Sequence, residues 1–139
     1  MATFILEIVS PERVAYARPV QSVSVPSETG QLTILPHHIG LFATLVEGEV
    51  IIKTQDKEQY LAIGGGFVEV TKEKVSVLVS RAFQADELNE QAIEKARKEA
   101  QAAIERGVTG SELQSAQALL RSTLVDLKVA RRRKKQSVY

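Results

Sequence analysis

Three segments of the sequence carry residue types that could bind an ion or a phosphate. His37 and His38 are the two histidines of the 139-residue chain, and cysteine is absent. Adjacent residues of an extended segment point to opposite faces, so we do not expect one metal ion to bind both imidazoles. Because no further His and no Cys is available to complete a site, the sequence predicts no metal centre.

The glycine run Gly64-Gly65-Gly66 is the second segment, since glycine loops let backbone amides approach a phosphate closely. Phosphate-binding loops open a helix and end in Lys-Ser or Lys-Thr, whereas this run precedes an apolar, strand-like segment. We therefore predict a bulge or a tight turn here. No nucleophile elbow or paired-carboxylate motif surrounds the Ser, His and Asp residues, so we predict no catalytic residue.

The third segment is a run of five cations near the C-terminus, Arg131-Arg132-Arg133-Lys134-Lys135. Cations are favourable at a helix C-terminus, which carries partial negative charge, so a solvated helix end explains the run as well as a contact surface does. Nucleic-acid binding usually needs cations spread over a face together with stacking aromatics, and neither accompanies this run. We predict no nucleic-acid partner.

The elements that must position these segments follow two different hydrophobic periods. A net charge of +1 and 44% hydrophobic residues are typical of a folded chain and indicate no particular partner. From Thr3 to about Ala85, apolar residues alternate in short runs separated by turn residues, as in Phe4-Leu6-Ile8 and Val23-Val25. This spacing predicts an antiparallel β-sandwich over residues 1–85.

Residues 86–139 follow a helical period instead, because good helix formers replace the β-branched and aromatic residues. Asp86 or Asn89 is suited to cap a first helix, and Ser111 a second after the Gly107–Gly110 stop. The expected inner faces are Ala-rich in the first helix and Leu-rich in the second: Ile93, Ala96, Ala100, Ala103 and Ile104, then Leu113, Ala116, Leu120, Leu124 and Leu127. The sequence thus predicts an α+β chain with a C-terminal antiparallel helical hairpin.

The alanine-lined face suggests that this hairpin is a two-state element. Burying an Ala methyl contributes about 0.8 kcal/mol, against roughly 1.5–3 kcal/mol for a Leu side chain. Short helices are marginal alone, so the hairpin must gain stability from the sandwich or from another protein. A permanently docked helical lid fits the periodicity equally well, and both interpretations stay open.

The loop Gly30-Gln31-Leu32-Thr33-Ile34-Leu35-Pro36-His37-His38 resembles the Gly-x-Leu-Gly-Ile-Leu-Pro-x-His stretch of the epsilon subunits of F-type ATP synthases. Downstream, Gly65 to Val70 and Val75 to Val79 resemble a strand pair of that family. The likeness covers nearly the whole chain, in the family's order of sandwich, junction and Ala-rich hairpin. Thr33 stands where Gly is usual in the family, and Ile39-Gly40 replaces a common Ala-Pro.

The resemblance implies a non-catalytic central-stalk subunit of a proton-driven ATP synthase. Its sandwich would bind the gamma subunit and rest on the membrane rotor ring of c subunits, with Gln31 and His38 as ring-contact candidates in the motif turn formed by Gly30, Leu32, Ile34 and Pro36. Its hairpin would enter the catalytic head of alpha and beta subunits. There the cations Arg131, Arg132, Arg133, Lys134 and Lys135 would meet acidic beta-subunit loops and inhibit ATP hydrolysis.

The family's ATP-binding motif, Ile/Leu-Asp-x-x-Arg-Ala, corresponds here to Leu88-Asn89-Glu90-Gln91-Ala92-Ile93. Asn replaces the Asp at 89 and Ala replaces the Arg at 92, so the guanidinium that would face phosphate is missing. Leu88, Asn89 and Ala92 therefore predict weak ATP binding at most. We expect no cofactor.

The N-terminus begins the strand-like alternation at once, so we expect no signal or transit peptide. No apolar run approaches the roughly 20 residues that cross a bilayer. The resemblance then implies a peripheral protein on the cytoplasmic face of a bacterial plasma membrane, or on the stromal face of a thylakoid, with membrane contact only through the complex. The alternative function is an autonomous β-sandwich binding module with a ligand-responsive helical lid.

Overall fold

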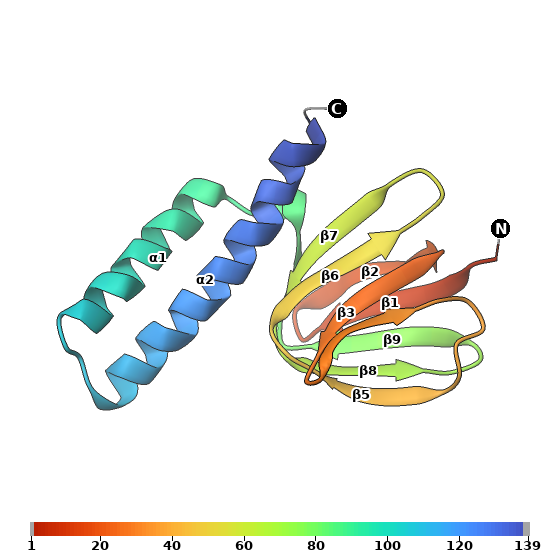
Figure 1. The fold of residues 1–139 in the computed structure, drawn as a ribbon, viewed down its shortest axis with the longest axis horizontal. Coiled ribbons are helices and arrows are strands. Elements are labelled where there is room, and N and C mark those ends of the chain that lie inside the picture. The colour runs from red at the N-terminus through yellow and green to blue at the C-terminus, as the bar shows by residue number, and fades with distance from the viewer. Residues whose placement is uncertain (1, 138–139) are drawn as a thin grey trace. The chain divides into compact units, whose positions relative to one another are not determined.

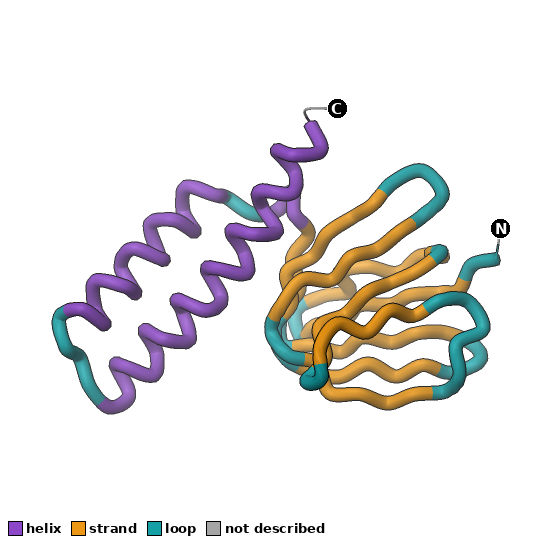
Figure 2. Tube along the Cα trace, in the orientation of Figure 1, coloured by secondary structure: helices purple, strands orange, loops and turns teal. Residues whose placement is uncertain are grey.

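The computed structural model describes the backbone of residues 2–137 and the side chains of residues 2–132. The chain divides after Gln84 into two compact units, a β unit and a helical unit (Figures 1 and 2). Each unit is described by itself.

Ten strands of the described residues form one continuous ladder in the first unit. Their order is β10-β7-β6-β3-β5-β8-β9-β1-β2, and β4 pairs with β3 beside this path. The strands are β1 (Phe4–Ser10), β2 (Arg13–Val20), β3 (Ser22–Ser27), β4 (Gly30–Ile34), β5 (Leu41–Leu45), β6 (Gly48–Lys53), β7 (Glu58–Ile63), β8 (Gly66–Val70), β9 (Lys74–Val79) and β10 (Ala82–Gln84).

The sheet folds into two layers because very little strand pairing joins its two halves. Strands β3 and β5 share one residue pair, Ser27 with Leu45, so the sheet bends there and its two parts face each other (Figure 1). All described pairings are antiparallel except β1 with β9, which run parallel. The predicted antiparallel sandwich is thus confirmed, with one parallel pair that the sequence did not indicate.

The core between the layers consists of the inward residues of each alternating strand. Leu6, Ile8, Val23, Val25 and Ile34 are fully buried, as the period of two predicts. Residues of β6 to β9 complete the same cluster: Val50, Ile52, Leu61, Ile63, Val68, Val70, Val75, Val77 and Val79. The β unit therefore has one continuous apolar core.

The glycine run acts through close packing, and it contains no positive-φ turn. A methyl group on Gly66 would lie 2.0 Å from the carbonyl oxygen of Leu78, and one on Gly64 would lie 2.1 Å from the Ser80 hydroxyl. The Gly64 amide donates to the Arg81 carbonyl at 3.0 Å. The run thus bends at Gly65 and lets the chain enter β8 directly against the end of β9.

Replacing Gly66 by Ala is expected to destabilise the β unit by about 3 kcal/mol, because backbone atoms must move to admit the methyl group. Gly65→Ala is the matched control, since its methyl would lie 3.4 Å from the Leu45 carbonyl oxygen, an ordinary contact. Chemical denaturation of both variants measures the difference. Equal stability of the two variants would contradict the packing argument.

The second unit contains a short 3-10 helix (Ala85–Glu87), α1 (Glu90–Glu105) and α2 (Gly110–Ser137). Asn89 caps α1, because its side-chain oxygen accepts a hydrogen bond from the Ala92 amide at 3.1 Å. Gly107 and Gly110 adopt φ values of 83° and 64°, which reverse the chain between the helices. The predicted antiparallel hairpin is confirmed (Figure 2).

The prediction that Leu124 lies on the inner face of α2 is wrong. Leu124 is 52% exposed, whereas Thr123 is buried and donates its hydroxyl to the Leu120 carbonyl at 2.9 Å. The buried and half-buried positions Leu113, Ala116, Leu120, Thr123 and Leu127 alternate steps of three and four. A seam of this kind follows a period of 3.5, so the next contact after Leu120 falls at position 123 and not at 124.

Candidate functional site

The segment that carries the family motif was described above as one loop, but in the structure it is a strand followed by a loop. Gly30 begins β4 with φ +119°, a conformation suited to glycine. Gln31 is exposed opposite Pro26 at this end of the strand, and Ile34 is buried at the other end. His38 follows that second end, so with about 3.3 Å per strand residue it lies roughly 10 Å or more from Gln31 along the chain. The structure does not bring the two ring-contact candidates together.

The loop after β4 borders a cleft of about 970 Å³ at one end of the β unit. Ile39 is 80% exposed and Leu35 is 56% exposed beside it. His37 has φ 67°, and the Nδ1 atom of His38 lies 2.8 Å from the Ile39 carbonyl oxygen. Within the part of the chain that the structure describes, no group of three His, Cys, Asp or Glu side chains is placed to hold a metal ion.

A second candidate surface lies on the outer face of the layer formed by β5, β8, β9, β1 and β2. Direct cross-strand pairs join Phe67 to Leu78, Leu78 to Val9 and Val9 to Val14 in one row. Phe42 stacks on Phe67 with ring centroids 4.9 Å apart. We call these five residues, Val9, Val14, Phe42, Phe67 and Leu78, the outer-face patch.

The outer-face patch is unusual because its large apolar side chains are solvent-exposed. Phe42 is 64% exposed, Val14 61% and Leu78 39%. The neighbouring row on the same face begins with Phe42 opposite Glu69 and is otherwise polar: Glu69 pairs with Ser76, and Lys74 forms an ion pair with Glu7 at 3.0 Å. An apolar centre with a charged rim is the composition of a protein-binding surface.

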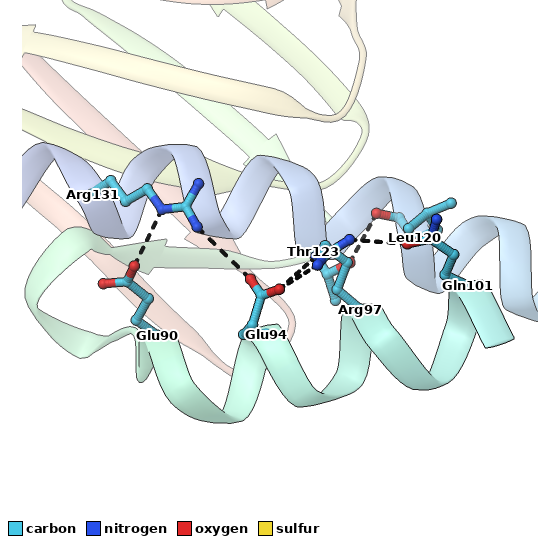
Figure 3. Close-up of polar contacts among 7 residues, drawn as sticks. All are labelled: Glu90, Glu94, Arg97, Gln101, Leu120, Thr123 and Arg131. Carbon is cyan, nitrogen blue, oxygen red and sulfur yellow. Dashed lines mark hydrogen bonds and ion pairs between the residues drawn. The ribbon is translucent and has the colours of Figure 1, made fainter.

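In the helical unit, charged side chains connect the start of α1 to the end of α2 (Figure 3). The Nε atom of Arg131 donates to Glu90 at 3.2 Å, and its Nη2 atom lies 3.8 Å from Glu94. Arg97 also donates to Glu94, at 2.9 Å from Nε, and its Nη1 donates to Gln101 at 3.0 Å. Two helices are thereby joined by one connected network.

Glu94 is the centre of this network. The hydrogen bond from Arg97 lowers the pKa of its carboxyl below the ordinary range, assisted by the charges of Arg97, Lys98 and Arg131. Glu94 therefore stays ionised at neutral pH and keeps its attraction for Arg131. Lys98 contributes through its charge, whereas the partners in direct contact are Arg97 and Arg131.

The residues of the nucleotide motif have other roles in this structure. Leu88 is buried, and the Asn89 side chain is engaged in capping α1. Ala92 is exposed and offers no polar group. A cleft of about 540 Å³ in the helical unit is lined by cations and carboxylates together: Lys95, Lys98 and Arg131 beside Glu90 and Glu94. Arg131 is already paired with both carboxylates.

The basic run is described only in part. Arg131 is exposed and bound to α1 carboxylates, and Arg132 is half-buried. The backbone of Arg133, Lys134 and Lys135 continues α2, while their side chains lie outside the described residues. No helix of the described residues is long and apolar enough to span a membrane.

Known proteins are similar over almost the entire chain. The family model for the ATP synthase delta/epsilon chain β-sandwich domain matches residues 3–85. The ATP synthase epsilon chain of Dehalococcoides mccartyi is 37% identical over 136 residues, covering 97% of each chain. That of Herpetosiphon aurantiacus is 38% identical over 129 residues, covering 93% of this chain and 95% of the relative.

The chain belongs to the ATP synthase epsilon-chain family. Solved structures agree on the fold of this chain. A chain of the Euglena gracilis mitochondrial ATP synthase superimposes with a TM-score of 0.70 at 18% identity, covering 100% of this chain and 83% of that one. A chain from the Tetrahymena thermophila mitochondrial ATP synthase gives a TM-score of 0.57 at 15% identity, covering 93% and 97%.

Sequence reasoning missed the outer-face patch and the acidic partners of Arg131 in this epsilon chain. A signal for the patch was present, because β5 and β9 carry apolar residues on both faces: Phe42 and Leu78 interrupt an otherwise regular alternation. Glu90 and Glu94 share one face of α1 at a spacing of four, which could have indicated a site for a cation. Their partner lies 41 residues from Glu90, beyond the reach of local patterns.

Proposed function

We propose that this epsilon-family chain is a non-catalytic rotor subunit in the central stalk of a proton-driven F-type ATP synthase. Its β unit binds the gamma subunit and rests on the membrane rotor ring of c subunits, so torque passes between the ring and the catalytic head. Its helical hairpin restrains ATP hydrolysis by contacting the alpha and beta subunits. Family membership supports the assignment to this enzyme complex.

The observation that carries the rotor role is the outer-face patch. A rotor subunit must stay attached while torque passes through it, which requires a broad contact with an apolar centre. Phe42, Phe67 and Leu78 provide that centre on a rigid sheet. We assign the patch to the gamma subunit, because it lies on the outer face of its layer, whereas the ring-contact candidates Gln31 and His38 lie at and beyond the ends of β4.

Co-purification with a gamma subunit tests the proposal. The rotor role requires a stoichiometric complex that survives gel filtration, whereas an autonomous binding module with a ligand-responsive lid would elute alone. As part of such a complex the chain would be peripheral, at the cytoplasmic face of a bacterial membrane or the stromal face of a thylakoid.

ATP is not expected to regulate this chain directly. Asn89 is used as a helix cap, Ala92 offers no guanidinium, and the nearby guanidinium of Arg131 is already paired with Glu90 and Glu94. Calorimetry of the full chain with Mg-ATP is therefore expected to give a dissociation constant weaker than about 1 mM, equivalent to about −4 kcal/mol. A micromolar dissociation constant would contradict the expected weak ATP binding, and it would not bear on the proposed rotor role.

A further inference from the structure

The closed hairpin is held by little apolar contact. Within the described residues, α1 fully buries one side chain, that of Ala100. The others on its inner face, including Ile93 and Ala103, are half-buried. Because an Ala methyl contributes so little on burial, an ion pair at the ends of the helices can measurably shift the stability of the closed pair.

One such contact ties the two ends of the helical unit together. Glu90 is the first residue of α1, and Arg131 belongs to the last described turns of α2. Glu90 and Glu94 lie one turn apart, so both carboxylates face the same guanidinium (Figure 3). The planar fork of Arg suits two acceptors at once, which a single Lys charge would not.

We propose that Arg131 is a latch residue that belongs to one of two mutually exclusive contacts. In the closed hairpin its guanidinium is held by Glu90 and Glu94, and carboxylates of a partner surface must displace these two to pair with it. Opening is then favoured by salt and by an acidic protein surface that competes for the same cation. This inference rests on the proposed function only for the identity of that surface, the acidic loops of the catalytic head.

The latch itself is tested on the full chain in isolation. The chain has no cysteine, so Glu99→Cys and Gln117→Cys on exposed positions of α1 and α2 allow two spin labels to report the helix separation. At low salt, Arg131→Gln and the double variant E90Q/E94Q are each expected to raise the ratio of open to closed hairpins about fivefold. At about 1 M salt the parent chain should approach the variants, because the Debye length falls to about 3 Å.

Two comparisons separate a charge latch from simple packing. Arg121→Gln removes an exposed arginine of the same helix and is expected to leave the ratio unchanged. Arg131→Glu is expected to open the hairpin, and the added exchange Glu90→Arg should close it again by restoring opposite charges. A hairpin that remains as closed in R131Q and in E90Q/E94Q as in the parent chain would overturn the latch.

A measurement in the assembled enzyme distinguishes the latch from the rotor proposal. E90Q/E94Q leaves the basic run intact but frees Arg131, so inhibition of ATP hydrolysis is expected to strengthen severalfold. If the chain binds gamma and this variant leaves hydrolysis unchanged, the latch is wrong and the rotor role stands. If the chain does not assemble with gamma at all, the rotor role fails, and the spin-label result still decides the latch.

Discussion

Phe42→Asp is expected to weaken binding of the chain to the gamma subunit at least about 100-fold, equivalent to about 3 kcal/mol. The substitution removes a ring whose burial would contribute roughly 1.5–3 kcal/mol and places a carboxylate against an apolar partner surface. Phe42 is 64% exposed and its ring stacks on Phe67, so the core behind β5 keeps its packing. Gel filtration of co-expressed chains and interferometry give the measured affinities.

Ile39→Asp is the matched control, because it adds the same charge to an apolar residue that is 80% exposed outside the patch. This variant should bind gamma as the parent chain does. Circular dichroism and thermal unfolding of both variants establish that each stays folded. Unchanged binding by Phe42→Asp would show that the gamma subunit does not bind the outer-face patch. That surface would then have no assigned partner.

The alternation of apolar residues was enough to predict most of the β unit, because one layer face is buried and the strand period is strict. Strands such as β1 and β3 place their predicted inner residues in the core. Strand β2 was not singled out, since a register shift after Ile8 breaks the match between its pattern and its partner. The parallel pair β1 with β9 joins segments about 70 residues apart, and no local pattern reports such a contact.

The candidate sites were harder to predict for a related reason. An exposed apolar patch forms only when neighbouring strands place apolar residues side by side. Val9, Phe67 and Leu78 become neighbours through strand pairing, which cannot be read from the sequence alone. The hairpin gives a second example, in which Leu124 was expected inside and Thr123 takes that position. The Gly107–Gly110 turn and the packing of the helices set which α2 residue meets Glu90, and periodicity leaves that register open.

Removing residues 131–139 is expected to raise ATP hydrolysis of the reconstituted enzyme severalfold without affecting its assembly. The truncation deletes all five cations of the basic run and keeps the buried residues Leu127, Val129 and Ala130, while the proposed gamma contact lies in the β unit. The gain should shrink as salt approaches about 1 M, because screening weakens the same charge contacts in the complete chain.

A chain of full length with Gln at positions 131 to 135 is the control for the shorter helix, and it should behave as the truncation does. Both differ in sign from E90Q/E94Q, which frees Arg131 while the cations remain and should therefore slow hydrolysis. The two kinds of variant have opposite effects because one guanidinium, that of Arg131, has two alternative partners. Removing the carboxylates of Glu90 and Glu94 favours the inhibitory contact with the catalytic head. Removing the cation itself abolishes both contacts. Unchanged hydrolysis in the truncated and Gln-substituted enzymes would show that the basic run does not inhibit.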